Sequence, residues 1–147
     1  MSSSISRHLR EAIATRADFL CEYCLIHEDD TFFGCEVDHI ISLKHGGITK
    51  RDNLAFVCFF CNRRKGTDLG SLVRPDEFIL FFNPRKDQWR DHFHLEGAII
   101  KPLTDVGIVT ARIFGFNSNE RVLEREVLIA ENRYPMPPAL KRMALDE

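Results

Sequence analysis

The sequences Cys21-Glu-Tyr-Cys24 and Cys58-Phe-Phe-Cys61-Asn-Arg-Arg-Lys65 stand at the two ends of the stretch that decides the fold. Each contains a Cys-x-x-Cys pair, and a long insert separates the two pairs. Two such pairs facing each other across an insert are the sequence form of a zinc site with four thiolate ligands. We therefore predict that one Zn²⁺ is bound by Cys21, Cys24, Cys58 and Cys61.

The predicted zinc site is structural, because four thiolates complete the tetrahedral coordination of Zn²⁺ and leave no open position. A redox role is the alternative, but a redox Cys-x-x-Cys motif normally occurs singly and in a βαβ context. The chain has five cysteines, and an odd number with four in pairs favours zinc over disulfides. We interpret the fifth, Cys35, as a small buried hydrophobic residue.

The insert between the cysteine pairs carries the residues for a second kind of site. Asp38 and His39 are adjacent, the turn His45-Gly-Gly47 follows, and Asn53 precedes an apolar run. Adjacent side chains on a strand point to opposite faces, so Asp38 and His39 serve one site only where the strand twists or ends. Carboxylate and amide oxygens suit Mg²⁺ or Mn²⁺. We therefore predict that Asp38 and Asn62 bind a catalytic divalent metal.

Taken together, these residues resemble the HNH endonuclease family in its zinc-knuckle form. The resemblance rests on Asp38-His-Ile40, Asn53-Leu54 and the second cysteine motif through Lys65, and it covers residues 21–66. It implies an α+β fold with a ββα-metal core that hydrolyses phosphodiester bonds in nucleic acid, usually DNA. Asn62 stands where the family archetype has its second histidine, which is the H-N-N variant of the motif.

The resemblance also implies a role for each residue of the site. His39 falls on the general base, which takes a proton from the attacking water. Asp38 and Asn62 fall on ligands of the divalent metal, which is Mg²⁺ or another ion such as Mn²⁺ or Ni²⁺. Asn53 falls on the central asparagine that holds the connecting loop and orients the histidine. One such site cuts one strand, so a double-strand break needs two engagements or a homodimer.

Basic residues gather around the predicted catalytic site. The segment from residue 44 to residue 65 contains six Lys and Arg residues against one acidic residue, although the whole chain has a formal net charge of −2. The residues that we expect to contact nucleic acid are Arg63, Arg64, Lys65, Lys44 and His45. A solvated basic helix face is the alternative for the first three, and a turn-stabilising role is the alternative for His45.

The composition, with 44% hydrophobic and 29% charged residues, is that of a globular chain. The N-terminus has no apolar run of signal-peptide length, and the longest apolar runs are too short to span a bilayer. We therefore predict a soluble, cytoplasmic protein with no membrane partner. The length predicts one domain, residues 1–147, with a nuclease core over residues 18–70 and a C-terminal α/β extension over residues 75–147 packed on it.

Periodicity places the elements of the core. Apolar residues on one stripe predict a helix over residues 5–19, capped by Ser4 or Ser6. The segment 35–43 is rich in β-forming residues, residues 54–58 read as a strand, and a short helix follows over residues 61–69. The intervening residues 25–34 are polar and acidic and predict a loop.

After a break at Arg74-Pro75 the pattern changes. Strands are predicted over residues 77–82 and 88–95, and we interpret His92 and His94 as surface or satisfied core residues. A helix over residues 105–114 has Thr104 as its cap and Gly115 as its stop. A second helix starts after Asn117 or Ser118 and runs to about Asn132 with Leu123, Val127 and Ala130 facing inward, and the tail beyond its prolines is expected to be loose.

Two other functions fit a zinc-stapled fold. A non-catalytic zinc-ribbon module would bind nucleic acid, and a structural protein would use the zinc unit as a scaffold for the C-terminal half. Neither function needs the combination of Asp38, His39, Asn53 and Asn62. We therefore expect a metal-dependent endonuclease.

Overall fold

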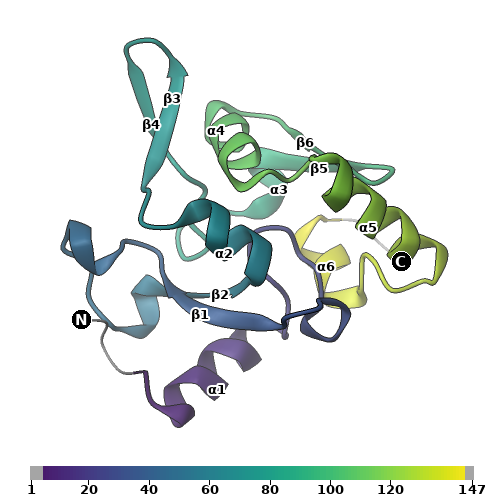
Figure 1. Ribbon diagram of the computed structural model, residues 1–147, viewed down its shortest axis with the longest axis horizontal. Coiled ribbons are helices and arrows are strands. Elements are labelled where there is room, and N and C mark those ends of the chain that lie inside the picture. Colours follow the sequence, from purple (N-terminus) through teal and green to yellow (C-terminus); the bar gives the residue numbers. More distant parts are fainter. Residues whose placement is uncertain (1–4, 145–147) are drawn as a thin grey trace.

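The computed structural model describes residues 5–144, whose buried hydrophobic residues form one continuous core from the first helix to the last (Figure 1). Within this range the strands form three two-stranded antiparallel sheets. The elements are α1 (Arg7–Arg16), β1 (Cys35–His39), β2 (Leu54–Cys58), α2 (Phe59–Lys65), β3 (Gly70–Arg74), β4 (Glu77–Leu80), α3 (Trp89–His92), β5 (Phe93–Glu96), β6 (Ile99–Pro102), α4 (Asp105–Phe114), α5 (Asn119–Ala130) and α6 (Pro137–Arg142).

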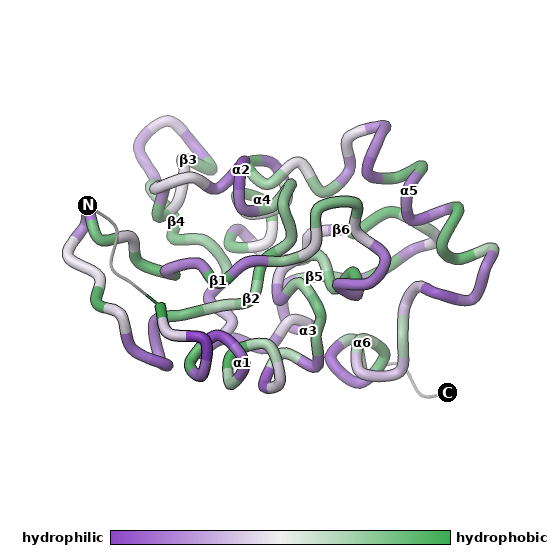
Figure 2. Tube along the Cα trace, turned by 60° about the horizontal axis from the view of Figure 1, so that its bottom comes forward, coloured by the Kyte–Doolittle hydropathy of each residue, from purple (hydrophilic) through white to green (hydrophobic). Residues whose placement is uncertain are grey.

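The hairpin of β1 and β2 lies between two helices at the centre of the core (Figure 1). Cys35 pairs with Cys58 at one end of the hairpin, and His39 pairs with Leu54 at the other. All five residues of β2 are buried, and the strand is hydrophobic along its length in Figure 2. Helix α2 follows β2 directly and contacts both strands, while α1 contacts them from the other side. This arrangement confirms the predicted α+β fold with a ββα core.

Helix α1 is shorter than predicted. Ser6 caps it, because its Oγ accepts a hydrogen bond from the Leu9 backbone N–H at 3.1 Å, whereas Ser4 lies outside the described residues. The helix ends at Arg16 instead of residue 19, since Asp18 and Phe19 adopt positive φ angles of 56° and 61°.

Other elements of the core also end early. The β pattern over residues 35–43 forms a strand only as far as His39, and α2 spans Phe59–Lys65 instead of residues 61–69. Gly66, with a φ of 53°, ends α2 in a backbone conformation that favours glycine. The predicted loop over residues 25–34 contains a short 3₁₀ helix, Glu28–Asp30, and β2 matches its predicted bounds.

The predicted break at Arg74-Pro75 is the turn of a hairpin that projects from the molecule in Figure 1. Strand β3, which the sequence pattern did not reveal, pairs with β4, and Arg74 lies opposite Glu77. The strand predicted over residues 88–95 is wrong in its first half, where α3 forms. The Trp89 indole N–H donates to the Tyr23 carbonyl at 2.8 Å, so burial of this side chain decides the local structure.

Helix α4 has the predicted bounds. The Thr104 side chain accepts a hydrogen bond from the Gly107 N–H at 3.1 Å, and Gly115 ends the helix with a φ of 65°. Helix α5 starts after Ser118, one of the two predicted caps, but its orientation differs from the prediction.

The buried residues of α5 are arginines. Leu123 and Val127, which we expected to face inward, are exposed, and so is Ala130. Two nitrogens of the buried Arg125 guanidinium are satisfied by the protein: Nε donates to the Ala98 carbonyl at 2.7 Å, and Nη2 donates to the Phe116 carbonyl at 2.6 Å, whereas Nη1 is buried without a hydrogen-bond partner among the described residues. Arg121 is buried one turn earlier on the same face.

The segment after α5 is not a loose tail. Tyr134 is buried, and α6 packs Ala139 into the core. Arg142 forms an ion pair with Asp18 at 3.0 Å, which joins the end of the chain to the turn after α1. In the part of the chain from residue 5 to residue 144, no helix has the length and hydrophobicity needed to cross a membrane.

Candidate metal centre and active site

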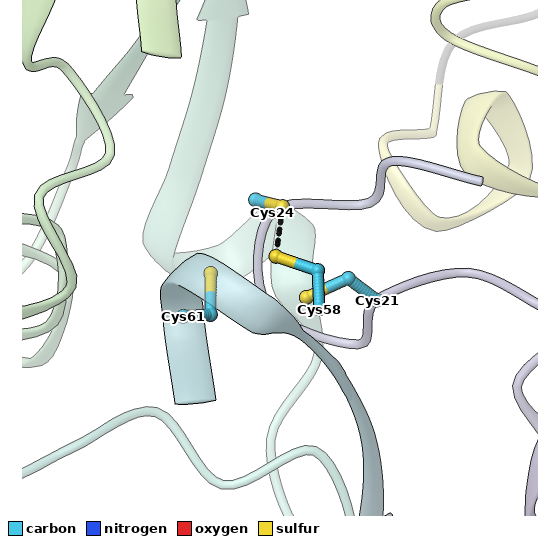
Figure 3. Close-up of side chains that lie close together, drawn as sticks. All are labelled: Cys21, Cys24, Cys58 and Cys61. Atoms are coloured by element: carbon cyan, nitrogen blue, oxygen red, sulfur yellow. Dashed lines mark hydrogen bonds between the residues drawn. The ribbon is translucent and has the colours of Figure 1, made fainter. Parts of the chain in front are cut away.

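The four cysteines of the two Cys-x-x-Cys motifs converge at one buried point (Figure 3). Cys21 and Cys24 come from the loop after α1, Cys58 ends β2, and Cys61 lies in the first turns of α2. Their sulfur atoms all lie within 4.8 Å of one another, and none forms a disulfide. Cys35 is buried but stands outside this group.

The geometry of the cysteine group fits zinc. A tetrahedral site with Zn–S bonds of about 2.3 Å separates its sulfur atoms by roughly 3.8 Å. The Sγ atoms of Cys24 and Cys58 lie 3.7 Å apart. As thiolates, four sulfur atoms this close together repel one another unless a cation lies between them. The residues present therefore fit the predicted structural Zn²⁺.

Arg121 of α5 places its guanidinium against this cysteine group. Nη2 donates to Cys24 Sγ at 3.1 Å, and longer contacts of 3.9 Å and 3.8 Å join Nη2 to Cys58 and Nη1 to Cys61. Burial acts to raise the pKa of Cys24, but hydrogen bonds from the other three cysteines and the charge of Arg121 lower it well below its usual value. The guanidinium therefore favours the thiolate form that a metal requires.

Further side chains hold the loop that carries Cys21 and Cys24. The Tyr134 hydroxyl donates to the Cys24 carbonyl at 2.8 Å. Glu22 is buried, accepts a hydrogen bond from the Phe56 N–H at 2.9 Å and pairs with Arg85. Burial raises the pKa of Glu22 to about 7 despite the hydrogen bond from Phe56. The first cysteine pair is thus held by both β2 and the C-terminal extension.

Asp38 and His39 lie at the end of β1, where the strand pairing stops. Lys65 of α2 approaches this dipeptide from inside the protein. Its ammonium donates to the His39 carbonyl at 2.9 Å and lies 3.1 Å from Asp38 Oδ2, an ion-pair distance without hydrogen-bond geometry. Lys65 therefore fixes the backbone of His39 and the carboxylate of Asp38 at once.

The position of Lys65 contradicts the expectation that it contacts nucleic acid. Its side chain is 1% exposed, so it cannot reach a phosphate from this position. A charged side chain is this deeply buried only when it has partners, and the carbonyl and carboxylate of the Asp38-His39 dipeptide are those partners. Sequence spacing could not reveal this, because Lys65 differs from the neighbouring arginines only in the side of the helix on which it lies.

Asn53 clamps the loop that joins β1 to β2. Its Oδ1 accepts a hydrogen bond from the Ile41 N–H at 2.9 Å, and its Nδ2 donates to the carbonyls of Ile41 and Ile48, each at 2.9 Å. A Cβ at Gly47 would lie 1.7 Å from the Ile41 carbonyl oxygen and 2.9 Å from Asn53 Nδ2, so only glycine fits beside the clamp. The loop after His39 is thereby held in one shape.

Thr49, which the sequence patterns did not single out, lies in the clamped loop and contacts His39. The His39 Nε2 and Thr49 Oγ1 atoms are 2.8 Å apart. With its proton on Nε2, the imidazole donates to this hydroxyl and carries its lone pair on Nδ1. The only signal in the sequence is that Thr49 stands between the glycine turn and Asn53, where the loop must return toward β1.

The remaining predicted site residues lie on or near the surface. Asn62 is partly buried on α2, one helical turn before Lys65, so helical periodicity turns it toward the same strand as Lys65. Arg63 and Arg64 are exposed on α2, and Lys44 and His45 are exposed in a short 3₁₀ helix, Leu43–His45. Among residues 5–144, no second group of three or more His, Cys, Asp or Glu side chains gathers as the cysteines do.

The two histidines of the C-terminal extension, His92 and His94, have no contact with the candidate catalytic residues among the hydrogen bonds of the described chain. His92 Nδ1 lies 2.7 Å from the Thr104 hydroxyl, and His94 is exposed on β5. These positions agree with their interpretation as satisfied or surface residues.

A ββα unit with a four-cysteine metal site defines the structural class of this part of the chain. The model of the HNH endonuclease family matches residues 21–68, which include the four cysteines, both strands of the hairpin and α2. The match confirms the resemblance that the motifs indicate. No curated protein and no solved structure matches the chain.

Proposed function

We propose that this chain is a metal-dependent endonuclease that hydrolyses phosphodiester bonds in nucleic acid, with DNA as its substrate. The observation that carries the proposal is the fixed position of His39 and Asp38. The dipeptide is held from inside by Lys65 at 2.9 Å and 3.1 Å, and the loop that follows it is clamped by Asn53. A binding module or a scaffold has no need of an imidazole held in this way.

His39 is the general base. Its Nε2 atom lies 2.8 Å from Thr49 Oγ1, a contact that holds the ring in one orientation, and its role is to take a proton from the attacking water. General-base catalysis of this kind contributes a factor of about 10² to 10⁴ to the rate. Asn53 acts indirectly, because it fixes the loop that presents Thr49 to the ring.

Asp38 and Asn62 are the protein ligands of a divalent metal. Asp38 Oδ2 is buried against Lys65, while the side chain as a whole is 21% exposed, so Oδ1 is the oxygen that Asp38 offers. A carboxylate and an amide oxygen fit Mg²⁺, Mn²⁺ or Ni²⁺ with water in the remaining positions. A metal held there supplies positive charge next to the phosphoryl oxygen and the leaving oxygen. Arg63, Arg64, Lys44 and His45 contact the phosphate backbone, which positions the substrate.

Plasmid cleavage tests the proposal. Purified protein is incubated with supercoiled plasmid in the absence of added metal and then with Mg²⁺, Mn²⁺ or Ni²⁺, beside the His39→Ala variant. We expect metal-dependent nicking or linearisation that falls by at least about 10²-fold in His39→Ala. His94→Ala, which changes an exposed histidine on β5, is the matched control and retains full activity.

Full cleavage by a folded His39→Ala protein would refute the assignment of the base. DNA binding in a gel shift without cleavage by any metal would instead identify a non-catalytic nucleic-acid-binding module.

A further inference from the structure

Four phenylalanine rings gather beside the start of α2. They come from two segments, the loop before β1 with Phe32 and Phe33, and the first turn of α2 with Phe59 and Phe60. The ring centroids are 4.7 Å apart for Phe32 and Phe33, 4.4 Å for Phe33 and Phe59, and 5.5 Å for Phe59 and Phe60. These distances are those of rings in direct contact. We call these four residues the aromatic cluster.

The aromatic cluster faces solvent instead of the core. Phe32 is 87% exposed, Phe33 is 59% exposed and Phe60 is 40% exposed. Single exposed apolar side chains are common, but a contiguous exposed group of large rings marks a binding surface. None of the three belongs to the buried core. The Phe60 ring contacts the Arg121 guanidinium at 5.3 Å, so the rings of Phe32 and Phe33 are the ones that the fold uses least.

The charge next to the aromatic cluster favours an anionic polymer. The Arg63 guanidinium carbon lies 5.3 Å from the centroid of the Phe59 ring, and Arg64 follows it on the exposed side of α2. In the described part of the chain, neither arginine has a carboxylate oxygen within 4.0 Å. In the acidic segment before the phenylalanines, by contrast, Asp30 is neutralised by Arg133 at 3.0 Å. The Arg64 guanidinium lies close to Gly115 at the end of α4, so Arg63 is the arginine beside the rings. A guanidinium next to exposed rings matches a ligand that combines phosphates with aromatic bases.

The aromatic cluster also lies next to the candidate metal ligand on the same helix. Asn62 follows Phe59 by three residues, which corresponds to about 4.5 Å along the helix axis. Neighbouring nucleotides of one strand are separated by about 3.4 Å of rise in duplex DNA and by more when the strand is extended. The cluster adjoins the Cys35–Cys58 end of the hairpin, whereas His39 lies at the other end of the five-residue strand β1, about 13 Å away. A base that contacts the cluster thus belongs to a nucleotide a few positions along the strand from the phosphate at His39.

We propose that the aromatic cluster stacks against unpaired bases of the bound strand, a few nucleotides from the cut phosphate, so that the substrate is single-stranded or locally unpaired DNA. This inference rests on the proposed function and adds the class of substrate. In an intact duplex the faces of the bases are covered by their neighbours, so protein rings stack only on bases that have left the helix. Phe32 and Phe33 supply the stacking faces, and Arg63 holds an adjoining phosphate.

Binding of labelled oligonucleotides tests this inference. The parent protein is full-length His39→Ala, which prevents cleavage during the measurement, and the probes are a fluorescent single-stranded oligothymidylate and a duplex of the same length. Fluorescence anisotropy is measured for the parent, for Phe32→Ala with Phe33→Ala, and for Phe78→Ala. Phe78 is the matched control because it is 57% exposed on β4, on a different element from the cluster.

We expect the double variant to bind the single strand about 5- to 150-fold more weakly per lost stacking contact, with duplex binding changed less than about twofold. The control binds both probes as the parent does. Both variants should retain the melting temperature of the parent, because the substituted side chains are exposed.

Three results would overturn the inference. These are unchanged single-strand binding in the double variant, an equal loss for both probes, and failure of the parent to bind the single strand. A change of the double variant from dimer to monomer in size-exclusion chromatography, with binding unchanged, would identify the cluster as an interface between copies of the chain. All these readouts are independent of cleavage, so the stacking surface can fail while the His39 plasmid test still supports the nuclease.

Discussion

The zinc site and the candidate catalytic site lie at opposite ends of the same hairpin and are built in different ways. At the Cys35–Cys58 end, four buried thiols stand within 4.8 Å of one another and form a complete ligand set. At the His39–Leu54 end, Asp38 is partly exposed, and Lys65 partly neutralises it. The first arrangement fits a structural metal, because four thiolates leave no coordination position open. The proposed second site has only two protein ligands and would leave positions for water and substrate.

The same contrast extends to the supporting residues. Arg121 and Tyr134 of the extension contact the cysteine loop directly, at 3.1 Å and 2.8 Å. The candidate catalytic site is supported from within the core, by Lys65 and by the Asn53 clamp. We infer that the C-terminal extension mainly stabilises the zinc site. Substitutions can therefore impair the zinc site and the candidate catalytic site independently of each other.

The largest effect is expected at the zinc site. Cys58→Ser removes one of four ligands, and structural zinc contributes about 10–16 kcal/mol in small zinc domains, as much as the whole stability of a typical domain. We expect the variant to lose bound zinc and to be unfolded at 25 °C, as measured by metal analysis and circular dichroism. Cys35→Ser is the matched control, since Cys35 is buried opposite Cys58 but is not a ligand. Normal zinc content and melting of Cys58→Ser would refute the site.

A smaller loss is expected from Lys65→Met. The substitution leaves the buried Asp38 oxygen and the His39 carbonyl without their cation, and breaking such a buried pair costs about 3 kcal/mol. In a chain of this size this lowers the melting temperature by roughly 6–12 °C.

The exposed neighbour Arg64 provides the control for Lys65. Arg64→Met should weaken DNA binding while melting remains unchanged. The opposite pattern, in which Lys65→Met reduces binding alone, would restore Lys65 as a nucleic-acid contact.

A third comparison separates two buried arginines of α5. Arg121→Met and Arg125→Met each remove a buried guanidinium, but only Arg121 contacts the cysteines. Loss of such an outer contact typically reduces metal affinity by about 10- to 100-fold. We therefore expect Arg121→Met to release zinc to a chromogenic chelator at least about tenfold faster than Arg125→Met. Equal release rates would show that Arg121 only fills space.

The smallest effect is expected at Asn62, which we propose as a neutral ligand of the second metal. Asn62→Ala should raise the Mg²⁺ concentration for half-maximal cleavage by about tenfold while zinc content and melting stay unchanged. Asn119→Ala, at an exposed position of α5, is the control. An unaltered Mg²⁺ dependence in Asn62→Ala would remove Asn62 from the ligand set.

The parts of the fold that the sequence predicts are those fixed by local chemistry. Each Cys-x-x-Cys pair and the helix between Thr104 and Gly115 are specified by motifs, caps or stops that act within a few residues, and the strand over residues 54–58 is specified by its own apolar run. The orientation of α5 is not fixed in this way. Arg121 meets Cys24 across 97 positions of the chain, so a rule that turns apolar residues inward selects the wrong face.

The candidate active site shows the same division. The spacing of Asp38, His39, Asn53 and Asn62 predicts which residues belong together, because the motif is carried by one hairpin and one helix. It does not reveal that Lys65 turns inward or that Thr49 contacts the imidazole, since both depend on how the loop folds in space. The contacts of Lys65 and Thr49 can be recognised only from interatomic distances in the folded chain.

The central claim is that the two sites hold metals with different roles, and one measurement tests it directly. Zinc content and plasmid cleavage are followed in the same sample after brief treatment with a weak chelator and after readdition of Mg²⁺. We predict that cleavage is lost while one zinc per chain remains bound, and that Mg²⁺ restores cleavage without any change in zinc. Cleavage that persists in the zinc-only protein, or that disappears only when the zinc leaves, would contradict the account.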